Sequence, residues 1–163
     1  MAKESLVAIE VPDEAYASGW NGKTEVPTKN AVHDMNERYL IFPLIDKDTD
    51  VTVQSSIGGD WVIPFNCTIL QSDTAKHKLA ARTDTAGTGG TMVVDIHKGG
   101  TSIMTTNKLD IETTEKSSAD AATQPDLTTT SYTAGDIITF DIDAIHSTTA
   151  AKGLKVYMAV RPT

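Results

Sequence analysis

The sequence predicts an all-β protein, an antiparallel jelly-roll-like β-sandwich preceded by an N-terminal arm with one short helix. Three observations predict this fold class. Thr is the commonest residue, and together with Val and Ile it favours strands because β-branched side chains fit a pleated surface. Strand-like runs recur from residue 51 onward, and glycine-containing turns separate them. No connection has room for a βαβ crossover.

The first element is the arm, residues 1–50, which is rich in turn formers. Thr28 is suited to cap a helix, and the spacing of Val32, Met35 and Tyr39 predicts one apolar stripe. A helix of roughly a dozen residues is marginal alone in water, so we expect it to dock on its own sandwich, on a sister subunit or on another protein. The expected attachment residues are Trp20, Val32, Met35, Tyr39, Leu40 and Phe42.

The second element is the sandwich, residues 51–163. A Gly99-Gly100 turn between two β-rich runs predicts a hairpin over 91–106, because glycine adopts the positive φ that tight hairpins need. The complete set of expected strands is 51–57, 61–70, 75–82, 91–98, 101–107, 136–145 and 154–160.

Alternation in the last two expected strands predicts which side chains enter the core. Asp141 and Asp143 fall on the face opposite to the apolar residues of their strand. The expected core residues of these strands are Ile138, Phe140, Ile142, Val156, Met158 and Val160.

Asp141 and Asp143 are the one acidic pair with a chemical interpretation. They fit a solvated polar face, a Ca²⁺ site completed by loop carbonyls, or the carboxylate pair of a carbohydrate-active hydrolase or lyase. Carboxylates two residues apart on one strand point the same way, however, and do not flank a bond from opposite sides. We therefore expect a protein that is not an enzyme, with no catalytic residue, metal site or cofactor.

The remaining composition excludes several function classes. The net charge of −8 repels phosphate backbones, so nucleic-acid binding is not expected. No run of apolar residues is long enough to insert into a membrane. The single cysteine, Cys67, lies in an apolar run and is expected to be a buried free thiol. The histidines, at 33, 77, 97 and 146, lack metal-ligand spacing, and His97 is expected to face solvent.

The string from 87 to 160 resembles a module of tailed-bacteriophage fibre, spike and capsid-decorating proteins. The similar elements are a strand ending in Asp95-Ile96, a glycine turn, "GTSI", "AGD" before an Asp-Ile-Asp strand, and "STTAAKGLKV". A looser likeness begins near residue 51. In the arm, "GWNGKTEVPTKNAVHD" is similar to segments that precede such domains. Gly99-Gly100 stands where that class often has Asn-Gly, and both satisfy positive φ.

The resemblance implies a virion structural protein, made in the host bacterial cytoplasm, that binds other virion proteins of the capsid or tail and forms a homotrimer. A head fibre or capsid decoration is the first reading, and a small tail fibre or receptor-binding tail protein is the alternative. The resemblance leaves open whether the sandwich binds host-surface glycans or only decorates the particle. A free glycan-binding module is the third option, but such a module does not need an arm that docks on another protein.

Overall fold

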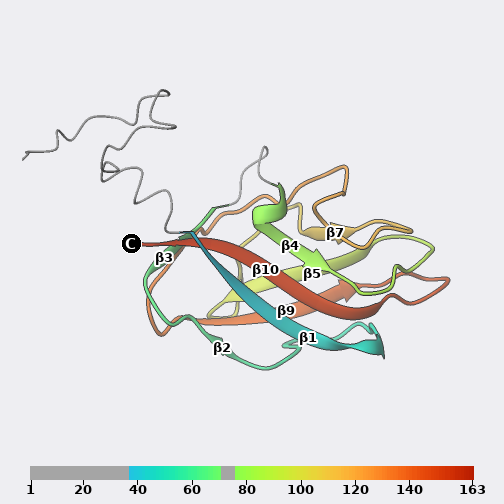
Figure 1. Cartoon of the computed structure of the whole chain (residues 1–163), viewed down its shortest axis with the longest axis horizontal. Helices are drawn as coiled ribbons and strands as arrows, with labels where there is room; N and C mark the ends of the chain where they lie inside the picture. Colours follow the sequence, from blue (N-terminus) through green and yellow to red (C-terminus); the bar gives the residue numbers. More distant parts are fainter. Residues whose placement is uncertain (1–36, 71–75) are drawn as a thin grey trace, which may run out of the picture. The chain divides into compact units, whose positions relative to one another are not determined.

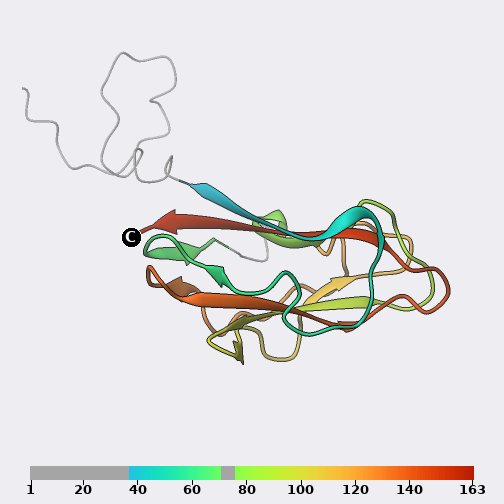
Figure 2. The ribbon, with the colours of Figure 1, turned by 90° about the horizontal axis from the view of Figure 1, so that it is seen from below.

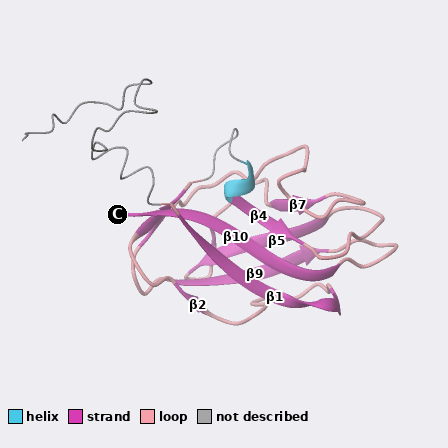
Figure 3. Ribbon diagram, viewed as in Figure 1, coloured by secondary structure: helices cyan, strands magenta, loops and turns pink. Residues whose placement is uncertain are grey.

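The computed structural model describes residues 37–70 and 76–163. These residues form two antiparallel β-sheets that pack face to face, with one 3-10 turn, and the expected all-β architecture is confirmed (Figures 1 and 3). Figure 2 separates the two layers, with β1 and β10 in one and β9 in the other. In these described ranges, no helix has the length and apolar character needed to cross a membrane.

Sheet A is built around β10, the last strand of the chain. One edge of β10 pairs with β1, and its other edge pairs with β3 and β4 in succession, while β8 extends the sheet beyond β3. A 3-10 turn at Lys76–Lys78 leads into β4. The strands of sheet A are β1 (Arg38–Asp50), β3 (Cys67–Ile69), β4 (Leu79–Arg82), β8 (Ser131–Tyr132) and β10 (Lys152–Pro162).

Sheet B is built around the antiparallel pair β5 and β9. The outer edge of β9 pairs with β2, and the outer edge of β5 pairs with β6 and β7. The strands of sheet B are β2 (Trp61–Val62), β5 (Met92–Lys98), β6 (Thr101–Ser102), β7 (Leu109–Ile111) and β9 (Ile137–Ala144).

The predicted hairpin is confirmed as β5, a glycine turn and β6. Lys98 pairs with Thr101, and the turn residues Gly99 and Gly100 have φ values of 55° and 81°. A side chain at either position would be strained in this left-handed region. The second strand is shorter than expected because the chain leaves β5 after Ile103, whose N–H donates to the Ile96 carbonyl at 2.9 Å, and the Ser102 hydroxyl accepts the Met104 N–H at 3.1 Å.

Three further expected strands have different limits. The run 75–82 begins with the 3-10 turn at Lys76–Lys78, and only Leu79–Arg82 is strand. The run 61–70 is broken into β2 and β3 around Pro64, which has no N–H to donate to a sheet ladder. The run 51–57 forms no continuous strand, but Gln54 makes an isolated bridge with Ile142, and the Ile57 N–H donates to the Phe140 carbonyl at 2.8 Å. This segment therefore lines the edge of β9 without continuous strand pairing.

The expected arm helix is wrong at its C-terminal end, because Tyr39, Leu40 and Phe42 lie in β1. Phe42 is only 6% exposed, and its ring centroid lies 5.4 Å from that of Trp61 and 5.0 Å from that of Phe140. Phe42 and Leu44 are buried whereas Ile41 and Pro43 are exposed, so burial in β1 follows the period of two of a strand and not the helical spacing that Tyr39 continues from Met35. The compact sandwich unit begins at Arg38, not at residue 51.

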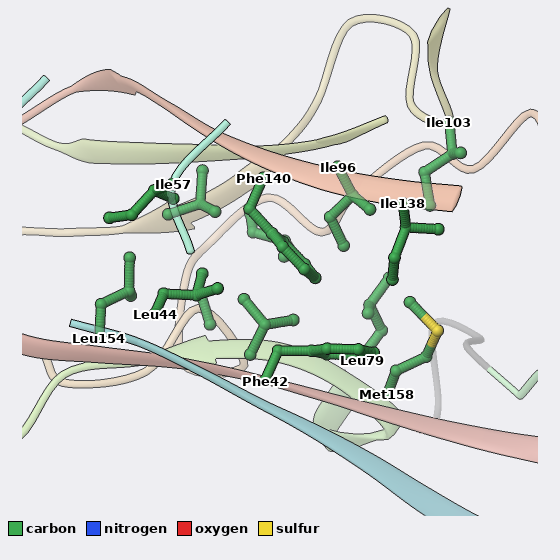
Figure 4. Packing of buried hydrophobic residues seen from close by; sticks show 14 of the residues in the cluster. Phe42, Leu44, Ile57, Leu79, Ile96, Ile103, Ile138, Phe140, Leu154 and Met158 are labelled. Atoms are coloured by element: carbon green, nitrogen blue, oxygen red, sulfur yellow. The ribbon is translucent and has the colours of Figure 1, made fainter. Parts of the chain in front are cut away.

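The core fills the space between the inner faces of the two sheets (Figure 4). Side chains from β9 and β10 meet there, together with Phe42 and Leu44 of β1. The predicted inward faces of the last two strands are confirmed, since Ile138, Phe140, Ile142, Val156, Met158 and Val160 are each at most 1% exposed.

We predict that Phe140→Ala lowers the free energy of unfolding by about 3 to 5 kcal/mol, because it leaves a cavity beside the Phe42 ring. Its neighbour Thr139 faces outward on the same strand, so Thr139→Ala should lower it by less than about 1 kcal/mol. Urea denaturation of both variants measures the difference. Equal losses at the two positions would mean that the inner face of β9 is misassigned.

We also predict that the chain tolerates deletion of residues 1–36 but not of residues 1–45. The shorter deletion keeps all of β1, whereas the longer one removes Phe42 and Leu44 from the core. Circular dichroism and thermal unfolding of the two truncated chains measure the outcome. A cooperative transition for the longer deletion at an unchanged temperature would show that the core does not need β1.

Candidate functional site

The charged side chains of β5 and β9 gather on the outer face of sheet B. Asp95 and His97 come from β5, and Asp141 and Asp143 come from β9. These residues point away from the core because they alternate with buried apolar residues. The pairing register places Asp95 directly opposite Asp141. Like charges in that position repel, so this face needs cations between them.

Asp95 is the most buried charged group of the site, with 2% of its side chain exposed. One carboxylate oxygen, Oδ1, accepts hydrogen bonds of 2.7 Å from the Ser102 hydroxyl and from the Ile96 N–H. The other, Oδ2, lies 2.5 Å from Nζ of Lys108. A buried carboxylate is costly unless it is both paired and hydrogen-bonded, and Asp95 is both.

Lys108 holds two carboxylates together. Its Nζ contacts Asp95 and also lies 2.7 Å from Oδ2 of Asp143. Burial lowers the pKa of Lys108, but the hydrogen bonds and charges of Asp143 and Asp95 outweigh it and raise the pKa above its ordinary value. The ammonium group is therefore retained as a cation between the two carboxylates.

His97 lies between Asp95 and the third carboxylate of the site, Asp141. Its Nε2 is 3.6 Å from Oδ2 of Asp95, and its Nδ1 is 3.6 Å from Oδ2 of Asp141. Asp141 in turn accepts a 2.8 Å hydrogen bond from the Ser56 N–H. His97 lies on the outer face of sheet B, but its side chain is only 18% exposed, so the expectation that it faces solvent is met only in part.

A second ion pair lies at the hairpin end of the same sheet. Nζ of Lys98 is 2.7 Å from Asp136, and it also donates to the Ser131 carbonyl at 3.2 Å. The hydrogen bond from Lys98, and then one from the Thr133 N–H, hold the pKa of Asp136 below its usual range. This pair ties the hairpin to the turn before β9.

The ion pairs and hydrogen bonds of this site connect neighbouring segments of sheet B. Asp141 and Asp143 lie on the polar face that the sequence predicts, but each is engaged, one with Ser56 and His97 and the other with Lys108. In the parts of the chain that the structure describes, His, Cys, Asp and Glu side chains form no group of three suited to a metal ion. The network therefore links β5, β9 and the segment that carries Lys108.

Sequence reasoning did not assign Asp95, Ser102 and Lys108 to this site. The alternation of Asp95 with apolar neighbours was visible, but the register that sets it opposite Asp141 was not. Lys108 reaches the site only because the chain leaves β5 after β6 and returns to it as β7.

The predicted attachment residues and Cys67 lie outside this site. Trp20, Val32 and Met35 lie outside the described residues, whereas Tyr39, Leu40 and Phe42 belong to β1. The expectation of a buried Cys67 is confirmed, and burial, followed by the charge of Asp136, raises the pKa of its thiol.

We predict that Lys108→Met lowers the free energy of unfolding by on the order of 3 kcal/mol, because it leaves Asp95 buried without its cation. The matched variant Asp143→Asn removes only a half-exposed partner and should cost less than about 1 kcal/mol. Adding Asp95→Asn to Lys108→Met should recover part of the loss. Urea denaturation compares the three, and similar effects for Lys108→Met and Asp143→Asn would contradict a buried pair at Asp95.

Comparison with known proteins gives no family for this chain. No protein-family model, curated protein or solved structure matches it. The functional interpretation consequently depends on the residues and surfaces described above.

Proposed function

We propose that this protein is a non-enzymatic structural protein of a bacteriophage virion, a head fibre or capsid decoration. Its N-terminal segment attaches to the particle, and its sandwich, which we take to be jelly-roll-like, projects outward. The observation that carries the proposal is the division of the chain between residues 37 and 38. All the strands of both sheets lie within Arg38–Pro162, so the chain has a self-contained module preceded by a separate segment.

The attachment residues in this proposal are Trp20, Val32 and Met35. They belong to the segment whose sequence resembles those placed before phage fibre domains. Phe42 and Leu40 are excluded as attachment residues because they pack against the core of the sandwich. The short helix of the proposal accordingly ends before β1 begins at Arg38.

The charges on sheet B support a structural role over a carbohydrate-active one. Asp143 is bound to Lys108, and Asp141 accepts the Ser56 N–H, so each carboxylate is already occupied by a partner within the sandwich. A glycosidase needs one carboxylic acid and one carboxylate directed at the same bond from opposite sides.

The partners in this proposal are other virion proteins and further copies of the same chain in a homotrimer. Three copies would dock three attachment segments at once, which raises the occupancy of a weak individual contact. The same multiplicity would strengthen any contact of the sandwich with host-surface glycans.

We predict that residues 1–36 are required and sufficient for attachment. Full-length protein added to particles that lack it should bind, whereas residues 37–163 should not, and residues 1–36 fused to an unrelated trimeric domain should attach. Cryo-electron microscopy and sedimentation of the particles measure occupancy. Full occupancy by residues 37–163 would place the docking surface on the sandwich, and release of sugars from host glycans would overturn the non-enzymatic assignment.

A further inference from the structure

The contact between Lys108 and Asp95 differs from three other lysine–aspartate pairs of the sandwich. Its carboxylate is 2% exposed, whereas the carboxylates of the comparison pairs are 25%, 60% and 28% exposed. Lys108 also contacts a second carboxylate, that of Asp143. An amine is therefore held against a nearly dry carboxyl group, with another carboxylate beside it. The comparison pairs, in the order given, are Lys98–Asp136, Lys152–Asp50 and Lys155–Asp84.

The two oxygens of the Asp95 carboxylate have different partners. Oδ2 lies 2.5 Å from Nζ of Lys108. Cγ is bonded to Oδ2, so it lies at most about 1.2 Å further from Nζ than Oδ2 does. Oδ1 accepts hydrogen bonds of 2.7 Å from the Ser102 hydroxyl and the Ile96 N–H. Two fixed donors on one oxygen stabilise the negative charge that develops there when a nucleophile adds to Cγ.

Asp143 supplies a proton acceptor on the other side of Nζ. Its Oδ2 accepts a hydrogen bond of 2.7 Å from Nζ of Lys108. Lys108 begins as an ammonium group, so Nζ must lose protons before its lone pair can attack a carboxyl carbon. Asp95 and Asp143 are the two groups in contact with Nζ that can take these protons.

We propose that Lys108 and Asp95 condense to an intramolecular amide bond between Nζ and Cγ, with Asp143 as the catalytic proton acceptor. The ion pair described above is the state from which the bond forms. This inference goes beyond the proposed function and does not depend on it.

The reaction balances without any further reactant. One proton passes from Nζ to Oδ2 of Asp95, which leaves a neutral amine beside a neutral carboxylic acid. Nζ then attacks Cγ and gives a second proton to Asp143, while Oδ1 carries the negative charge. The Cγ–Oδ2 bond breaks, Oδ2 takes the proton back from Asp143 and leaves as water, and the carbonyl at Oδ1 re-forms. The third proton stays on Nζ as the amide N–H.

The fold favours condensation over hydrolysis. Reacting groups that a fold holds in contact behave as if their concentration were on the order of 10⁵ M or higher, which drives an otherwise unfavourable condensation. The burial of Asp95 keeps bulk water away from the product. The bond would tie β5 to the residue before β7, where Val94 already pairs with Leu109.

The first test is the intact mass of the purified full chain, measured after denaturation. The wild type should be lighter than its sequence mass by one water molecule. Lys108→Arg should have the full sequence mass, because a guanidinium keeps the charge but stays protonated and cannot attack. The control Lys98→Arg, in the pair with Asp136, should lose water as the wild type does. A wild-type chain at the full sequence mass would overturn the inference.

The second test locates the bond by mass spectrometry of tryptic peptides. Residues 83–98 and 99–116 should be recovered as one branched species, because trypsin cleaves after Lys98 but not after a lysine whose Nζ is in an amide bond. Separate peptides, or a loss of water within either one alone, would show that the lost water comes from another reaction, which overturns the inference.

The third test measures the role of Asp143 by following the intact mass during cell-free synthesis. Asp143→Asn should form the bond on the order of 100-fold more slowly, because the amide oxygen accepts a hydrogen bond but not a proton. The reaction should still reach completion, since Asp143 is 40% exposed and water can take the proton in its place. Formation at the wild-type rate would overturn the assigned proton path.

The bond also bears on the stability predictions for this site. Asp143→Asn is compared with the wild type once its mass has reached the final value, so the small loss predicted for it is unchanged. Lys108→Met lacks the bond as well as the cation, and the missing bond adds to its predicted loss.

Discussion

The pairing of β1 with β10 is the interaction on which the rest of the structure depends. It joins the first and last described strands into one sheet and directs Phe42 into the space between the layers. There the Phe42 ring contacts Phe140 of sheet B and Trp61 of β2. Without β1, the inner face of β10 and the aromatic cluster would both be open to water on one side of the sandwich.

The charged face of sheet B depends on a second constraint, the register between β5 and β9. Because side chains alternate, a slip of one residue would turn Asp95 toward the core and Val94 toward solvent. With the observed register, Asp95 meets Lys108, Ser102 and the Ile96 N–H. A buried ion pair adds little net stability, since desolvation offsets attraction, but breaking it is costly. The network therefore penalises wrong registers more than it stabilises the correct one.

These two constraints define which side chains the sandwich presents on its surface. One outer face is crossed by ion pairs that are satisfied within the chain, while Tyr39 and Ile41 of β1 and Val62 of β2 are exposed apolar side chains. In the proposed virion protein, the segment before Arg38 is the attachment segment.

The sequence by itself determined the all-β class, the hairpin at Gly99-Gly100 and the inward faces of β9 and β10, because these follow from propensity, turn chemistry and alternation within one segment. Only the tertiary structure decided that Tyr39 and Phe42 belong to a strand, because Tyr39 also continues the helical spacing of Val32 and Met35, and β10 supplies the backbone partners that select the strand. It also decided the site, because Asp95, Asp141 and Lys108 meet through strand pairing between residues far apart in the chain. Such pairing depends on how all the strands share one core, and no local pattern encodes it.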